Sequence, residues 1–231
     1  MRWKQLTKAT LRMPREFANA FTCNTLDAPQ NAFLDRFGKV VALVEQLLAG
    51  AHLYILVEES AALGLLKHLK PYASQASVRV EMLHQPVVQV FEGELGTLRF
   101  PQPIGYVTLL EKMPSEGEVS EEEYERMRIE NNIPKQGIDF NHEMFLDLGI
   151  HAISFTKGCY LGQEVMARGE KIKPARKLIR ILYEKVPEIV TVKGLPVGKV
   201  SSCCFSQKHQ KHLCFALIKR WDEPIDGGHI L

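Results

Sequence analysis

The order of apolar runs in the first half of the chain limits the fold most. Residues 33–57 indicate two strands around a polar insert, with an Asp-Arg-Phe-Gly turn at 35–38. A helical segment follows, and after it come two runs of alternating apolar and polar residues, SVRVEML and VVQVFEG. Two more predicted strands, GTLRFP and IGYVTLL, come next. Strand, strand, helix, strand, strand is typical of an α+β layer rather than a wound parallel sheet.

The helical segment in that series covers residues 60–72. Ser60 is a candidate N-cap, and Pro71 marks the expected exit because proline lacks the N–H that an interior turn needs. Leucines recur at helical spacing in this segment. The pattern predicts a buried face made of Leu63, Leu66 and Leu69.

A second helix is predicted over SEEEYERMRIEN. Ser120 and Glu123 have the spacing of a capping box, and acids fill the first turn, where the helix dipole favours them. Asn131 and Asn132 can adopt the left-handed conformation that ends a helix. We therefore expect this helix to end just before Pro134.

The pattern changes in the last quarter of the chain. Residues 135–156 are mostly loop, and from about residue 175 short strands alternate with glycines. This part is typical of a small all-β module. We expect a larger α+β domain over residues 1–172 and a C-terminal β-barrel over residues 173–231.

Composition points to a cytoplasmic globular protein. Hydrophobic residues make up 45% of the chain and charged residues 24%, both ordinary for a soluble domain. The best apolar run, VVALVEQLLAG, is broken by Glu45, and the basic N-terminus lacks the apolar stretch of a signal peptide. A net charge of +2 is too small to indicate nucleic-acid binding by itself.

Basic residues nevertheless gather in one stretch, opposed only by Glu170. Such a run usually marks a solvated face, but it is also suited to a polyanion such as an oligoglutamate tail or RNA phosphates. Both interpretations stay open on sequence alone. The cations are Arg168, Lys171, Lys173, Arg176, Lys177 and Arg180.

Four of the five cysteines offer no clear chemistry. The number is odd and no CxxC occurs, which makes a poor disulfide framework and a poor structural zinc site. Cys203, Cys204 and Cys214 lie in strand-like runs, where a buried free thiol is expected. His209 and His212 lie nearby, so a weak metal site is an alternative.

Cys159 differs because glycines and charges surround it. Lys157 is close in sequence, Gly158 and Gly162 allow close backbone approach, and GQEVMAR indicates the start of a helix. A nearby cation and a helix N-terminus both lower the pKa of a thiol. The residues alone leave two alternatives: a reactive thiol, or a small apolar side chain that fills a turn.

The capped helix carries a second candidate pair. A carboxylate at Glu130 could accept two hydrogen bonds from the amino-pyrimidine edge of a pterin, and Tyr124 could stack on its ring. The alternative for Glu130 is a solvated helix end.

These motifs together resemble a known family. The stretch from RIENNIPKQGIDF to MFLDLGIHAISFTKGCYLGQEVMAR is similar to the signature of the YgfZ/GcvT folate-binding family. Lys-Gly-Cys-aromatic-x-Gly-Gln-Glu, present at 157–164, marks the YgfZ branch, bacterial proteins tied to iron–sulfur enzyme maintenance and tRNA modification. EFANAFTCNTL and AFLDRFGKVVA resemble the family's early segments more loosely, and GLPVGKVSSCCFS resembles its C-terminal barrel.

The resemblance implies a folate-binding, GcvT-like domain over residues 1–172, made of linked subdomains around a central opening. Tetrahydrofolate would bind in that opening, and iron–sulfur enzymes or assembly proteins would be the partners, without a membrane. Cys159 would be the functional thiol. The residues implied to contact the cofactor are Glu130, Tyr124, Lys157 and Trp3.

Three functions compete on this basis. The first is a folate-binding accessory factor for iron–sulfur cluster assembly or repair that indirectly supports tRNA modification. The second is an aminomethyltransferase-like enzyme, but Gly38 is followed by Lys-Val-Val-Ala-Leu, with no acid to assist amine chemistry. The third is a non-catalytic scaffold whose folate site has decayed.

Overall fold

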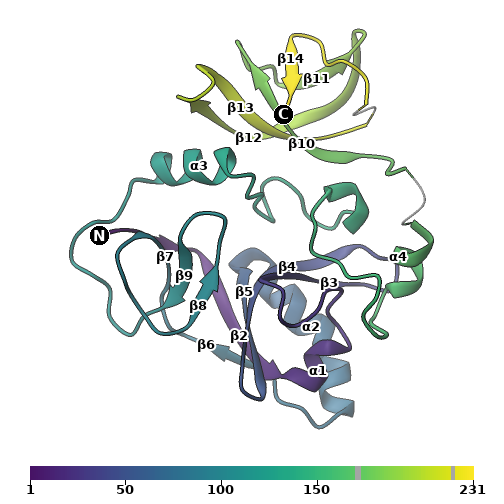
Figure 1. Cartoon of the computed structure of the whole chain (residues 1–231). Helices are drawn as coiled ribbons and strands as arrows, with labels where there is room; N and C mark the ends of the chain where they lie inside the picture. The colour runs from purple at the N-terminus through teal and green to yellow at the C-terminus, as the bar shows by residue number, and fades with distance from the viewer. Residues whose placement is uncertain (170–172, 220–221) are drawn as a thin grey trace. The chain divides into compact units, whose positions relative to one another are not determined.

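A computed structural model describes residues 1–169, 173–219 and 222–231 of the chain (Figure 1). Within those ranges, none of the helices is both long enough and apolar enough to cross a membrane.

The chain divides into two compact units. Unit 1 joins Met1–Val119 to His151–Ala167, and unit 2 joins Ser120–Ile150 to Arg168–Leu231. The division does not follow the boundary predicted at residue 172, because Ser120–Ile150 makes its contacts with the C-terminal strands.

Unit 1 contains a five-stranded antiparallel sheet in the order β3-β4-β5-β2-β6. Helices α1 (Arg15–Asn19) and α2 (Glu59–Gln75) pack against it and close a core of aliphatic and aromatic side chains. The strands are β2 (Lys8–Pro14), β3 (Gln30–Leu34), β4 (Val40–Ala49), β5 (His52–Glu58) and β6 (Glu81–Leu83).

A second, smaller sheet completes unit 1 in the order β1-β7-β9-β8. Its small core contains Trp3, Val88, Val90 and Leu110. The strands are β1 (Arg2–Leu6), β7 (Val87–Glu92), β8 (Arg99–Pro101) and β9 (Tyr106–Leu109).

Several local predictions for unit 1 need correction. Residues 33–57 contain parts of three strands, not two, because the chain turns again after β4. Helix α2 runs on through Pro71, since Leu69 and Ala73 on either side of it are buried in the core and hold the last turn in place. Leu63 is 62% exposed, so the predicted leucine face is wrong at that position, and Leu65 is buried instead.

Unit 2 begins with α3 (Glu121–Glu130), where the N-cap role predicted for Ser120 is confirmed. The Ser120 hydroxyl accepts a 3.1 Å hydrogen bond from the Glu123 N–H. At the other end Asn132 takes the left-handed conformation, with φ of 57°, which confirms the predicted stop. A short 3-10 helix, η1 (Phe145–Leu148), lies in the predicted loop region.

The C-terminal strands of unit 2 form one antiparallel sheet in the order β11-β12-β13-β10-β14. The small β module is therefore confirmed, but closure of this sheet into a barrel is not. The strands are β10 (Lys177–Tyr183), β11 (Ile189–Val192), β12 (Leu195–Ser206), β13 (Lys211–Ile218) and β14 (Gly228–Ile230).

The register of β12 and β13 corrects one prediction about cysteines. Cys203 lies directly opposite Cys214, with 4.0 Å between their Cα atoms, and the two form a disulfide. They are therefore not the free thiols expected from their strand-like context. Cys204, the next residue, is free and half-buried.

Candidate functional site

The turn at residues 157–164 presents one thiol to solvent. It lies in unit 1 and leads into α4 (Gln163–Gly169), so the predicted helix start is confirmed. Cys159 is free and exposed, and the space where Gly158 would carry a Cβ is open. Cys159 is therefore not a side chain that fills a packed turn.

Lys157 holds this turn to the last residue of α1 and to the segment that follows it. Its ammonium donates to the carbonyl oxygens of Asn19 at 3.0 Å, Thr22 at 2.6 Å and Asn24 at 2.9 Å. Burial lowers the pKa of Lys157, although the neighbouring Cys23 opposes that shift. The three donors of this ammonium thus serve backbone carbonyls, so Lys157 has a positioning role in the turn.

Two buried side chains pack behind the exposed turn. The Cys23 thiol is fully buried and donates to the Ala152 carbonyl at 3.2 Å, and burial raises its pKa to about 12. Burial, assisted by Cys23, also raises the pKa of Tyr160 to about 12. Cys23 therefore has the inert, space-filling role that Cys159 lacks.

Gly162 allows the close backbone approach predicted for the motif. It has φ of 87°, and a Cβ at this position would lie 2.6 Å from the carbonyl oxygen of Asp35. Gly38, in the same β3–β4 turn as Asp35, has φ of 76°, and its Cα faces the Val165 and Met166 side chains of α4. The Asp-Arg-Phe-Gly turn and the cysteine turn therefore pack backbone to backbone. Gly158 has no such neighbour, so the prediction of close approach is wrong there.

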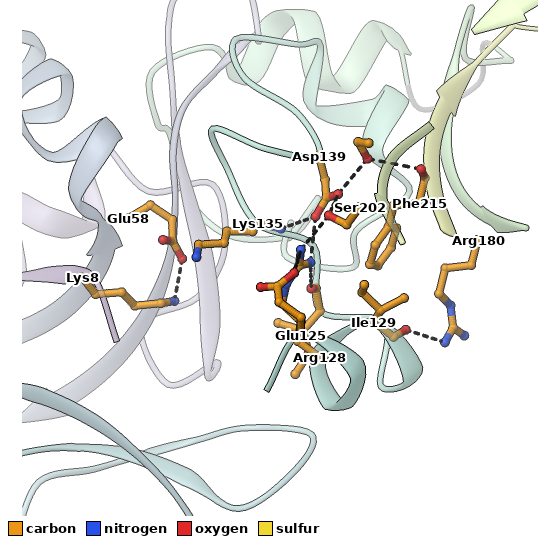
Figure 2. Close-up of polar contacts among 12 residues, drawn as sticks. Lys8, Glu58, Glu125, Arg128, Ile129, Lys135, Asp139, Arg180, Ser202 and Phe215 are labelled. Atoms are coloured by element: carbon orange, nitrogen blue, oxygen red, sulfur yellow. Dashed lines mark hydrogen bonds and ion pairs between the residues drawn. The ribbon is translucent and has the colours of Figure 1, made fainter. Parts of the chain in front are cut away.

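Unit 2 contains a buried charge cluster that sequence reasoning missed. Figure 2 shows Arg128 of α3 between Glu125 and Asp139. Its guanidinium donates to both carboxylate oxygens of Glu125 at 2.7 and 2.6 Å, and to Asp139 at 2.9 Å. It also donates to the Ser202 hydroxyl on β12 at 2.6 Å.

Asp139 joins the same cluster to the loop after α3. Its carboxylate accepts from the Lys135 N–H at 2.8 Å and from the Ser201 hydroxyl at 2.7 Å, as well as from Ser202. Burial alone would lower the pKa of Arg128, but its bonds to Glu125 and Asp139 outweigh burial and raise it. The cluster is a fully bonded structural lock between α3, its loop and β12.

Glu130 and Tyr124, the two candidates on α3, occupy different surroundings. The Glu130 carboxylate accepts from the Ser206 hydroxyl at 2.6 Å through one oxygen, and its backbone carbonyl accepts from Arg180 at 2.7 Å. Tyr124 is only 7% exposed. Six residues apart on a helix, the two side chains point about 120° away from each other.

The pterin contact predicted for Glu130 stays a prediction, and the structure leaves acceptor positions on its carboxylate for such a contact. A carboxylate has about four acceptor positions, and the bond to Ser206 uses one of them. The stacking role predicted for Tyr124 would need an exposed ring face. That role stays a prediction.

Trp3 is also covered. Its side chain is 4% exposed within the small core of unit 1, and its indole N–H donates to the Glu116 carbonyl at 2.8 Å. This is a satisfied core tryptophan, and its contact with a cofactor stays a prediction.

A buried ion triad in unit 1 was also missed. The Lys8 ammonium lies 2.6 Å from a carboxylate oxygen of Glu45 and 3.2 Å from one of Glu58. Figure 2 shows the second of these contacts. The sequence gave one signal for it, because Glu45 interrupts the apolar run that becomes β4.

Two cations of the basic run are already paired with acids. Lys173 lies 2.6 Å from Asp222, and Arg176 contacts Glu143 and lies 3.7 Å from Asp147. Lys171 lies outside the described residues. These pairs favour the solvated-face interpretation.

The alternative metal site near His209 and His212 also lacks support. The His212 ring packs edge-on against Phe205, with 5.5 Å between centroids. In the described parts of the chain, no group of three or more His, Cys, Asp or Glu residues is placed to hold a metal ion.

Comparisons with known proteins bear on family and fold. No family model matches the chain. The chain is 28% identical to the mouse (Mus musculus) protein named "Iron-sulfur cluster assembly factor IBA57, mitochondrial", over an alignment of 215 residues that covers 77% of this chain. The chain spans 59% of the length of that relative.

Among solved structures, the chain is similar to the glycine cleavage system aminomethyltransferase T from Bartonella henselae. The TM-score is 0.77 with 11% sequence identity, and the match covers 94% of this chain and 78% of that one. The fold is therefore GcvT-like, with mixed helix and sheet. The two likenesses confirm the resemblance to the YgfZ/GcvT family that the sequence motifs predicted.

Proposed function

We propose that this chain, which resembles the YgfZ/GcvT family in sequence and fold, is an accessory factor for iron–sulfur cluster assembly or repair with Cys159 as its functional thiol. One observation carries the proposal: the signature turn exposes Cys159, while Lys157 and Gly162 fix the backbone on both sides of it. The mouse relative, named as an iron–sulfur cluster assembly factor, supports the same function.

The chemistry of an exposed thiol suits this role. A thiolate is a soft ligand for iron and for iron–sulfur intermediates, and it must be accessible to meet a partner. Of the other cysteines in the structure, Cys23 is buried, Cys204 is half-buried with a pKa that burial raises to about 11, and Cys203 is bonded to Cys214. Cys159 is thus the cysteine best placed to contact a cluster, an iron intermediate or a partner protein.

Folate binding is the second part of the proposal. Glu130 would hold the amino-pyrimidine edge of tetrahydrofolate through the acceptor positions that Ser206 leaves open. Bound folate would supply one-carbon chemistry. Indirect support of tRNA modification and a cytoplasmic location remain predictions, and the mouse relative is named as mitochondrial.

Aminomethyl transfer is the alternative enzyme function. The GcvT-like fold favours it, but the residues after Gly38 begin β4 as Val-Val-Ala-Leu and bring no acid. Measurable transfer to tetrahydrofolate from an aminomethylated carrier protein would favour this function instead.

The iron–sulfur part is tested in cells. Deletion of the gene is expected to lower the activity of iron–sulfur enzymes, and the wild-type gene is expected to restore it. Unchanged cluster-enzyme activity in the deletion strain, under oxidative as well as normal growth, would contradict the proposed role.

The folate part is tested by calorimetry with purified protein and tetrahydrofolate. We expect binding that Glu130→Ala weakens by roughly tenfold or more, as expected for a charged hydrogen-bond acceptor. Glu122→Ala, at an exposed position of the same helix, is the matched control. No heat of binding at high ligand concentration would favour a scaffold without folate.

A further inference from the structure

The outer face of α2 and the segment after it form a hollow that the proposed function does not use. The hollow has a volume of about 540 Å³, within the range of roughly 300–1,000 Å³ that is typical of binding pockets. One wall is α2 from Leu63 to Ser74, and the other is the segment 78–80, which a Val78-to-Ala73 backbone bond of 2.9 Å ties to the helix.

The α2 wall follows from helical spacing. Leu63, Lys67, Lys70 and Ser74 lie four, three and four residues apart, so they form one stripe along the outside of the helix. Leu63 is 62% exposed at one end of this stripe. A single exposed apolar side chain is common on protein surfaces, but this one borders the apolar lining of the hollow and extends the apolar surface that a partner could contact.

The hollow is apolar at its floor and basic at its edge. Leu66, Leu69 and Ala73 contribute to the lining from α2, and all its ionisable lining residues are cations: Lys67, Lys70 and Arg79. Neither lysine has an acidic partner within the part of the chain that the structure describes. Arg79 lies 3.4 Å from Glu81, whose carboxylate is also bonded to Arg12.

We propose that this groove, defined by α2 residues 63–74 and the segment 78–80, docks an acidic amphipathic helix of a partner protein. The stripe on α2 is about 16 Å long at 1.5 Å per residue, which matches three turns of a docked helix. Such a helix inserts apolar side chains at i, i+3, i+4 and i+7, and its flanking carboxylates would meet the three cations.

A folded partner fits this site better than a membrane does. A bilayer surface is flat and would not fill a hollow, and three cations give only a weak attraction to anionic lipid, about 1 kcal/mol each. A docked helix uses both the hollow and the charges.

Fluorescence anisotropy with the full chain tests the proposal. The probe is a labelled synthetic peptide of about 18 residues, long enough to form a helix, with leucines at i, i+3, i+4 and i+7 and glutamates between them. A second peptide carries lysines in place of the glutamates. We expect the acidic peptide to bind at least about tenfold more tightly than the basic one, and less tightly as salt rises.

Variants locate the binding. The double variant Lys67→Glu/Lys70→Glu and the single variant Leu63→Asp are each expected to weaken binding of the acidic peptide by about tenfold or more. Lys112→Glu/Lys208→Glu changes the net charge equally at exposed positions elsewhere, and Leu195→Asp alters another exposed leucine. Both controls are expected to bind within about twofold of wild type.

Several results would overturn the proposal. One is equal binding of both peptides, and another is wild-type affinity in the groove variants. Binding to phosphatidylserine vesicles that depends on Lys67 and Lys70, without peptide binding, would identify a membrane surface instead. Concentration-dependent dimerisation that the Leu63→Asp variant abolishes would identify a second copy of this chain. The peptide assay contains neither folate nor a cluster enzyme, so its failure leaves the proposed function intact.

Discussion

Two cations, one half-buried in unit 1 and one fully buried in unit 2, show how differently this chain uses positive charge. Lys157 in unit 1 binds three neutral carbonyls beside an exposed cysteine. Arg128 in unit 2 is 1% exposed and binds two carboxylates, a hydroxyl and a carbonyl. The first cation shapes a surface turn, and the second locks elements together in the interior.

The difference bears on function. A closed network such as that of Arg128 and Asp139 has no donor or acceptor left to act on a ligand, so its contribution is structural specificity. The turn after Lys157 is held at its start by the three Lys157 hydrogen bonds, but its thiol is exposed. We therefore propose the cysteine turn as the functional site, and we assign structural specificity to the charge cluster.

The largest loss of stability is expected from a substitution that breaks the charge cluster. Arg128→Met keeps the volume but leaves Asp139 buried without its cation, which should lower the free energy of unfolding by about 3–5 kcal/mol. Urea unfolding measures it. Arg15→Met is the control, because Arg15 is half-exposed and lies 3.7 Å from Glu16, and it should cost less than about 1 kcal/mol. Equal effects of the two variants would contradict the structural lock.

A smaller effect is expected in the cysteine turn. Gly162→Ala combines a φ of 87° with a Cβ only 2.6 Å from the Asp35 carbonyl, and should cost about 1–3 kcal/mol of unfolding free energy. Gly158→Ala, in the same motif with open space around it, should change it by less than about 0.5 kcal/mol. Thermal melts of both variants measure the two changes in stability. An equally stable Gly162→Ala protein would mean that the two turns do not pack as described.

Lys157→Met tests the positioning role directly. Three carbonyls lose their donor, so we expect a loss of about 1–3 kcal/mol in the free energy of unfolding. Hydrogen exchange should rise at residues 19–24 and 157–162 and stay unchanged in α3. A variant with normal exchange in both segments would remove Lys157 from the role assigned to it.

The smallest effect concerns pH. The Cys23 thiol has a pKa of about 12 in the folded chain, raised from 9.0, so the folded state holds its proton more tightly than the unfolded state. Its contribution to stability is full below pH 9.0 and declines as pH rises from there toward about 12. Cys23→Ala should therefore flatten the loss of unfolding free energy above pH 9.0. Cys159→Ala is the control, and an unchanged slope in Cys23→Ala would contradict the buried thiol.

Parts of the fold and of the candidate site that depend on neighbouring residues could be predicted from the sequence. The Ser120 cap and the Asn132 stop of α3 depend on residues a few positions apart, and both are present as expected. The close approach at Gly162 was also predicted, although the same prediction was wrong for Gly158 in the same turn. Runs of alternating apolar and polar residues predicted the α+β class and most strands of the two units.

Contacts distant in sequence were not predictable. The pairing of β1 with β7 joins residues about 85 positions apart, and β1 and β2 went unrecognised in a segment read only as a basic N-terminus. The Arg128–Ser202 bond spans 74 residues, and the Cys203–Cys214 disulfide depends on strand register. Leu63 was assigned to the core because helical spacing shows which residues share a face, but not which face is inward.

The central claim is that Cys159 is a functional thiol and the other cysteines are structural. The most direct measurement compares the activity of an iron–sulfur enzyme in a deletion strain carrying either Cys159→Ala or Cys204→Ala, with equal protein levels. Cys204 is a half-buried free thiol whose pKa burial raises to about 11. Cys204→Ala therefore removes a free thiol as Cys159→Ala does, but not the thiol proposed to be functional. We predict rescue by Cys204→Ala and no rescue by Cys159→Ala; full rescue by Cys159→Ala would contradict the account.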